Sequence, residues 1–150
     1  MAETLGSLCD KLTIIKLKQF HVSDQVRLNS LNEQEIIIKE EIDHFAFNAL
    51  NGLVPLNKLS FENNKVFKKN GNQIQKIEGN LGEVFALLAK INCDLWHAQE
   101  KVYDFEKVPA GEKNGVIKRL AVLNLERNKC IDEIDKNLIK LVIKKLKVKI

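Results

Sequence analysis

The sequence predicts an all-α protein, an antiparallel four-helix bundle in which two helical hairpins are joined by a long asparagine-rich connection. Three observations support this prediction. Apolar residues recur at helical spacing in four long segments, turn-forming residues gather between the second and third segments, and 150 residues hold only two prolines and seven glycines. A chain of this length typically forms one domain, so we expect a single helical domain over residues 1–150.

The first hairpin is predicted from helices at about residues 4–21 and 23–49. Thr4 and Ser23 are the expected N-caps, because a hydroxyl oxygen can accept a hydrogen bond from a free amide of the first turn. The short turn between the helices implies that they run antiparallel. His21, at the end of the first helix, is expected to cap its carbonyl end.

Residues 50–79 are predicted to form the connection, since eight asparagines and three glycines fall between Asn48 and Asn80. Loops of this length are commonly functional, so we expect a partner-specific surface here. The connection is also expected to include a short strand near Lys65–Lys68. The second hairpin is predicted from helices at about 80–105 and 112–147. Residues 145–150 alternate with a period of two, and a terminal strand is the alternative there.

The formal net charge of +4 belongs to the C-terminal segment alone. Residues 136–150 hold six of the 24 basic side chains and no acid, which leaves 18 basic and 20 acidic side chains in residues 1–135. The amphipathic pattern of this tail predicts a helix packed on the bundle with solvated lysines. Contact with nucleic acid or an anionic membrane surface is the alternative, and it predicts binding that weakens as salt rises.

The sequence lacks the motifs of the common enzyme classes. It contains neither a Gly-x-Ser-x-Gly elbow nor a Walker-type or dinucleotide glycine loop, so no cofactor is expected and an enzyme is the less favoured class. Three cysteines without a Cys-x-x-Cys pair argue against disulfides or structural zinc. The first residues lack the pattern of a signal peptide, which predicts a cytoplasmic protein.

Polar residues interrupt the apolar faces of all four predicted helices. At 100° per residue, Glu35 lies about 40° from Leu31 and Arg127 about 20° from Val116, so both are predicted to point inward. The same count places three further polar residues on core faces: Lys16, Asn92 and Gln99. Two interpretations follow. Glu35 pairs with Arg127 in a structural polar layer, or Arg127 and Lys16 bind an anion in a pocket where Glu35 handles a proton.

Two acid-x-x-His pairs have the spacing of ligands in carboxylate-bridged metal sites: Glu41 with His44, and Asp94 with His97. In a bundle such ligands must face the core. His44 and His97 instead lie about 220° and 160° from the reference residues of their apolar faces, so we expect no metal site.

Three motifs carry a family resemblance: Gly6-Ser7-Leu8-Cys9-Asp10-Lys11-Leu12-Thr13-Ile14, Asn92-Cys93-Asp94-Leu95-Trp96 and Asn124-Leu125-Glu126-Arg127. With them the sequence resembles a group of uncharacterised bacterial all-helical proteins catalogued as domains of unknown function. The resemblance implies an all-helical fold and a cluster of six residues: Asp10, Lys11, Asn92, Trp96, Asn124 and Arg127. Gln99 stands where the group has Glu, and no motif implies an activity.

We therefore predict a non-enzymatic helical binding or scaffold module. The alternative is a small enzyme, or a protein that binds an anionic ligand such as a sugar or phosphate compound through the polar layer. The expected partner is accordingly a protein or a small anionic ligand, and association into homo-oligomers is compatible with both readings.

Overall fold

The computed structural model describes residues 2–61 and 74–148, and the regular structure in these residues is entirely helical. The α-helices in these ranges are α1 (Leu5–His21), α2 (Gln25–Leu50), α3 (Leu81–Tyr103) and α4 (Lys113–Val148). The same described residues also form the 3-10 turns η1 (Leu56–Lys58), η3 (Phe105–Lys107) and η4 (Ala110–Glu112). The all-α prediction is confirmed, and each α-helix begins and ends within two residues of its predicted range.

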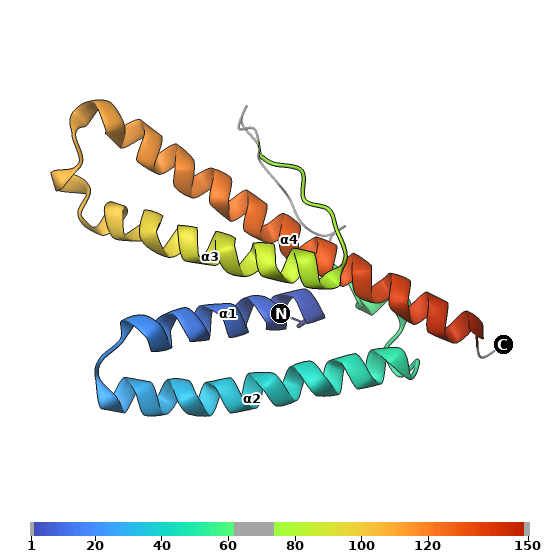
Figure 1. The fold of residues 1–150 in the computed structure, drawn as a ribbon. Helices are drawn as coiled ribbons and strands as arrows, with labels where there is room; N and C mark the ends of the chain where they lie inside the picture. The colour runs from blue at the N-terminus through green and yellow to red at the C-terminus, as the bar shows by residue number, and fades with distance from the viewer. Residues whose placement is uncertain (1, 62–73, 149–150) are drawn as a thin grey trace.

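In Figure 1, α3 and α4 lie next to each other, α1 packs beside this pair, and α2 lies on the far side of α1. The helices α1 and α3 run in one direction, and α2 and α4 run in the other. Helix α1 packs against all three other helices, whereas α2 packs mainly against α1 and makes fewer contacts with α4. Helix α2 therefore lies at an edge of the fold, and only Leu31 and Ala49 of its residues are buried.

The first two helices each begin at a residue whose side chain caps the helix. The Oγ1 of Thr4 accepts from the amide of Ser7 at 3.2 Å, and the Oγ of Ser7 accepts from the amide of Thr4 at 2.8 Å, so this predicted cap forms a reciprocal pair. The expected cap at Ser23 is wrong, because Asp24 caps α2 instead. The negative charge of an aspartate is also stabilised by the positive, N-terminal end of the helix dipole.

The core is built mainly where α3 meets α4, and α1 packs on that pair. The fully buried residues include Val84, Leu88 and Ile91 of α3 and Leu123, Ile134 and Val142 of α4. Leu59, which follows η1, is also fully buried, so the predicted connection contributes to the core. The strand suggested near residues 65–68 lies outside the described residues.

Helices α1 and α4 touch backbone to backbone at Gly6. The Gly6 amide donates a buried hydrogen bond of 2.8 Å to Oδ1 of Asp135. A methyl group at this position would lie 2.3 Å from the carbonyl oxygen of Ile131. Glycine is therefore required here by the close approach of the two helices.

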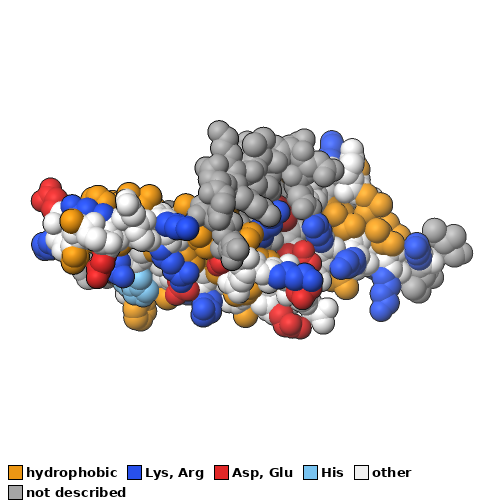
Figure 2. Space-filling view, turned by 90° about the horizontal axis from the view of Figure 1, so that it is seen from above, with side chains coloured by type: hydrophobic (Ala, Val, Ile, Leu, Met, Phe, Trp, Pro, Cys, Tyr) orange, Lys and Arg blue, Asp and Glu red, His pale blue; other side chains and the backbone are white. Residues whose placement is uncertain are grey.

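The lysine-rich tail continues α4 as a helix up to Val148, so the alternative of a strand is wrong for residues 145–148. Leu138 and Val142 are buried, and Figure 2 shows Lys and Arg side chains, which it colours alike, along the surface of α4. None of the helices in the described ranges combines the length and the apolar character that a membrane span requires.

Candidate functional site

A buried polar cluster, formed by Asp10 and Thr13 of α1, Asn92 of α3 and Arg127 of α4, joins three helices. Arg127 donates from Nε to Oδ1 of Asp10 at 2.9 Å and from Nη2 to Oδ2 at 2.6 Å. The Nδ2 of Asn92 donates to Oδ1 of Asp10 at 2.9 Å and to Oγ1 of Thr13 at 2.7 Å. The hydroxyl of Thr13 donates to the Asp10 carbonyl oxygen at 2.8 Å. We call these four residues the polar cluster.

The polar cluster is closed on itself. Asp10 is 4% exposed, and both of its carboxylate oxygens accept charge-assisted bonds from the two-pronged guanidinium of Arg127. These bonds raise the pKa of Arg127 above its usual value, although partial burial opposes the change. Among the described residues, no member of the cluster has a buried side-chain nitrogen or oxygen without a hydrogen-bond partner. The arrangement is that of a structural bridge between helices.

The predicted pairing of Glu35 with Arg127 is wrong. Glu35 lies between α1 and α2, where Lys16 Nζ is 3.3 Å from its Oε1 and Gln19 Nε2 donates to its Oε2 at 2.8 Å. The hydrogen bond from Gln19 and, to a smaller extent, the bond from Lys16 lower the pKa of Glu35 below its usual value. Lys16 is exposed, so these two residues belong to a surface network that is separate from the polar cluster. Gln99 is half-buried, and its side chain makes no hydrogen bond to another described residue.

The residues implied by the family resemblance divide into two groups. Asp10, Asn92 and Arg127 meet in the polar cluster. The other three point elsewhere: Lys11 pairs with Glu3, Trp96 donates to Glu100 at 3.0 Å, and Asn124 is exposed. The sequence patterns did not single out Thr13 or the buried Asp135, which binds the Gly6 amide.

An aromatic stack joins the end of α1 to α3. The rings of His21 and Trp96 lie 4.6 Å apart at 9° to each other, and His97 meets His21 edge-on at 6.2 Å. The expected capping role of His21 is wrong, because the Val22 amide binds the Lys18 carbonyl oxygen at this helix end and the His21 ring packs on Trp96. The stack fixes where α1 ends relative to α3.

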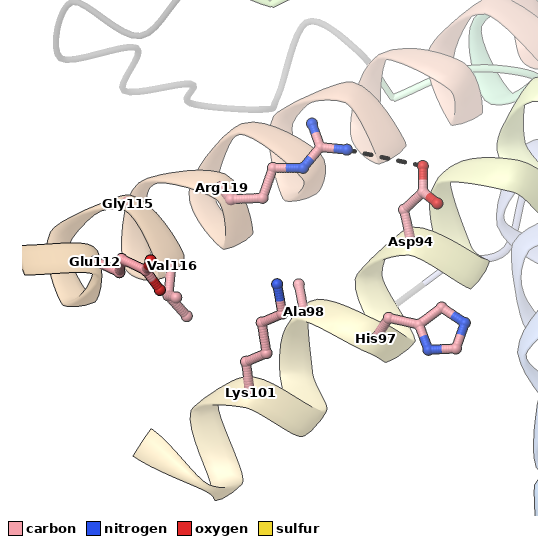
Figure 3. Close-up of a pocket in the computed structure, with 8 residues that line it drawn as sticks. All are labelled: Asp94, His97, Ala98, Lys101, Glu112, Gly115, Val116 and Arg119. Atoms are coloured by element: carbon pink, nitrogen blue, oxygen red, sulfur yellow. Dashed lines mark ion pairs between the residues drawn. The ribbon is translucent and has the colours of Figure 1, made fainter. Parts of the chain in front are cut away.

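A cavity of about 390 Å³ opens between the far ends of α3 and α4 (Figure 3). Arg119 lies 3.9 Å from Asp94 across it, and Figure 3 shows Lys101 extending between the two helices. The side chain of Lys101 makes no ion pair or hydrogen bond to any described residue. The remaining lining residues are His97, Ala98, Glu112, Gly115 and Val116. Basic and acidic groups therefore share this cavity.

The two acid-x-x-His pairs lie in different parts of the structure and do not form a common site. His97 lies 3.6 Å from Glu100, and His44 lines a different hollow between α1 and α2. Within residues 2–61 and 74–148, no three His, Cys, Asp or Glu side chains are grouped as a metal site would require.

The thiols of α1 and α4 are expected to be unreactive in the folded protein. Burial raises the pKa of Cys9 to about 12 and that of Cys130 to about 12, with nearby carboxylates adding to the effect. At pH 8, iodoacetamide should therefore modify the half-buried Cys93 first, as mass spectrometry of the native protein can measure. Equal labelling of Cys9 and Cys93 would contradict this.

The same thiols predict how stability depends on alkaline pH. Their folded pKa lies above the usual value of 9.0, so the unfolded chain loses these protons first as pH rises. The free energy of unfolding should therefore fall between about pH 9 and pH 12. Urea titrations at pH 8 and pH 10 measure this, and a Cys9→Ala variant should show a shallower fall. An unchanged slope in that variant would refute the assignment.

Comparisons of the chain with protein-family models, with curated proteins and with solved structures gave no significant match, so the family resemblance carried by its three motifs stays a prediction.

Proposed function

We propose that this chain is a non-enzymatic interaction module that binds another protein through the surface of α1 and α2. The closed polar cluster supports this class of function, because a carboxylate held by a guanidinium and an amide has no free group for proton transfer. We also propose that the four helices form an antiparallel bundle, in which the edge position of α2 leaves its outer surface for a partner.

The observation that carries the proposal is a long hollow between α1 and α2 with an apolar floor. It consists of two adjoining parts of about 510 and 350 Å³, which share Ile37. We call it the α1–α2 groove. Its apolar lining comprises Leu8, Ile14, Ile15, Ile37, Ile38 and Phe45.

Apolar side chains on α2 are unusually accessible to solvent. Ile36 is 56% exposed and Ile37 is 53% exposed, although both lie in the middle of α2. Large adjoining apolar surfaces favour burial against another chain, and a groove between two helices suits an amphipathic helix. Phe47 adds a further exposed aromatic ring to α2.

Photo-crosslinking from the groove tests the proposal. A benzoylphenylalanine at position 37 of the full chain should crosslink to one defined protein in cells, whereas the same probe at the exposed Lys140 of α4 should not. The captured protein is then purified and titrated against the wild-type chain and an Ile37→Glu variant. A loss of affinity of about tenfold or more supports the proposal.

Identical crosslinking patterns from positions 37 and 140 would reject the interaction module. So would equal affinities of the captured protein for the wild-type chain and Ile37→Glu, since the groove would then contribute nothing to binding. Circular dichroism of each variant checks that its helical content is unchanged.

The α3–α4 cavity supports a second candidate, the binding of a small anionic ligand. Lys101 and Arg119 supply the donors, and the cavity is large enough for a phosphate or a small sugar phosphate. Inorganic phosphate should then raise the melting temperature of the wild-type protein but not that of a Lys101→Ala, Arg119→Ala variant. Equal shifts in both proteins, or none in either, reject this candidate.

A further inference from the structure

We infer that the partner of the α1–α2 groove is an amphipathic helix of another protein with charges of both signs. Its acidic side chain lies on one edge of its apolar face, and its basic side chains lie about two turns away on the other edge. This inference rests on the proposed function, because it states the chemistry of the partner of the same surface. The length of the groove, its apolar floor and the charges at its two ends support it.

The groove has the length and the lining of a site for a helix. Its residues on α2 extend from Gln34 to Phe45, which is roughly 16 Å, or about three turns, at a rise of about 1.5 Å per residue. Apolar side chains from both α1 and α2 line each of its two hollows. A helix with apolar side chains at positions i, i+4 and i+7 would therefore fill both hollows from one face.

The two ends of the groove carry opposite charges on opposite sides. Lys18 lies on the α1 side at one end, whereas Glu40 and Glu41 lie on the α2 side at the other end. All three residues are exposed, and none of their side chains forms an ion pair or hydrogen bond with another described residue. The charge of Lys11, in contrast, is paired with that of Glu3. The uncompensated charge therefore changes sign along the groove, which favours a partner with the opposite charge at each end.

The distance between these charges sets the spacing expected in the partner. Lys18 and Gln34 line the same hollow, so they lie at about the same level of the hairpin. Gln19, next to Lys18, donates to Glu35 at 2.8 Å, which agrees with this level. Glu40 lies six residues beyond Gln34, roughly 9 Å along α2. The acidic and basic side chains of a helical partner must therefore lie about two turns apart.

Other occupants fit these charges less well. A strongly acidic helix would be repelled at Glu40 and Glu41, and a strongly basic one would be repelled at Lys18. A second copy of this chain does not supply the required charges, because a two-fold axis through Ile37 sets Glu41 of one α2 against Glu33 of the other. A helix with both signs in the stated arrangement is attracted at each end, around an apolar centre of the kind that protein interfaces usually have.

Titration of helical probe peptides against the full chain, followed by fluorescence anisotropy, tests the inference. Three hydrocarbon-stapled peptides share one apolar face and differ only in the charges at its edges. The mixed probe has glutamate on one edge and lysines two turns away on the other, and it is made with these charges in either order along the peptide. The other two probes carry only lysines or only glutamates. The better mixed probe should bind the wild-type protein about fivefold or more tightly than either uniform probe.

Charge reversal in the groove should change which probe binds best. Lys18→Glu makes both ends acidic and should prefer the lysine probe, whereas Glu40→Lys with Glu41→Lys makes both ends basic and should prefer the glutamate probe. A gain of binding to a different probe cannot come from loss of the fold, so these variants report on the groove itself.

Two matched controls make the same changes in net charge at exposed residues outside the groove lining. Lys140→Glu matches the first groove variant, and Asp43→Lys with Glu106→Lys matches the second. Both controls should keep the preference of the wild type for the mixed probe. If they change the preference as much as the groove variants do, net charge decides the binding and the inference is overturned.

Three further results would overturn the inference. They are a wild type that binds no probe with a dissociation constant below about 1 mM, a wild type that prefers a uniform probe, and a preference that survives both groove reversals. Sedimentation velocity of the wild type alone should show a monomer at about 100 µM. A dimer that Ile37→Glu dissociates would make a second copy the occupant and would also overturn the inference. If the inference fails but position 37 still crosslinks to one defined protein, the interaction module stands; if position 37 captures nothing defined, both fail.

Discussion

Replacement of Arg127 by alanine should lower the free energy of unfolding by about 3–5 kcal/mol, the largest effect we expect from a single substitution. Arg127 supplies two of the three hydrogen bonds to the side chain of Asp10, which is buried between α1, α3 and α4. Without the guanidinium, that carboxylate would stay buried with one amide donor and no compensating charge. Urea titration of the wild type and the variant measures the difference.

Two further variants separate the charge effect from a general loss of packing. Lys16→Ala, which breaks the exposed pair with Glu35, should change stability by less than about 1 kcal/mol. Replacement of the whole pair by Asp10→Leu and Arg127→Met should recover most of the loss, because it leaves no buried charge without a partner. If the pair replacement is as unstable as Arg127→Ala alone, the assigned cause is wrong.

Replacement of Gly6 by alanine should lower the free energy of unfolding by about 2–4 kcal/mol, the second largest effect that we expect. The new methyl group would lie 2.3 Å from the carbonyl oxygen of Ile131, which is backbone and cannot rotate away. Helix α1 would have to move from α4, and the bond from the Gly6 amide to Asp135 would lengthen. Thermal unfolding should show a lower melting temperature.

Gly82 supplies the matched control for this substitution. It also lies in the first turn of a helix, α3, but a methyl group there would meet nothing within 4 Å. Gly82→Ala should therefore be neutral or stabilise the protein by up to about 1 kcal/mol, through lower entropy of the unfolded chain. A similar loss at both glycines would mean that the α1–α4 contact does not set the cost, because a methyl group at Gly82 meets nothing.

The helices could be predicted from the sequence because their apolar residues recur with a clear period. Leu88 of α3 and Leu123 and Ile134 of α4, which belong to these helically spaced apolar residues, are buried. The edge position of α2 could not be predicted in this way. Its stripe from Leu31 to Ala49 has normal helical spacing, and period alone does not reveal how much of a stripe another helix covers.

The polar cluster could be predicted only in part, for a geometrical reason. Asn92 and Arg127 were placed inward because α3 and α4 each have one dominant core face. Helix α1 packs against all three other helices and buries two faces, with Leu8 and Ile15 on one and Gly6, Cys9 and Asp10 on the other. A count from Leu5 puts Asp10 about 140° away, so the pattern missed the true partner of Arg127.

The polar cluster also fixes the order in which the chain can assemble. Its contacts join residues 82 and 117 positions apart, and the Gly6–Asp135 bond joins residues 129 apart. During synthesis, the α1–α2 hairpin therefore waits on the order of 10 s for Arg127 to be added. Through that interval neither α3 nor α4 covers Asp10 and the apolar inner face of α1. A chaperone or a neighbouring nascent copy would therefore bind the chain at this stage, when only the hairpin has been made.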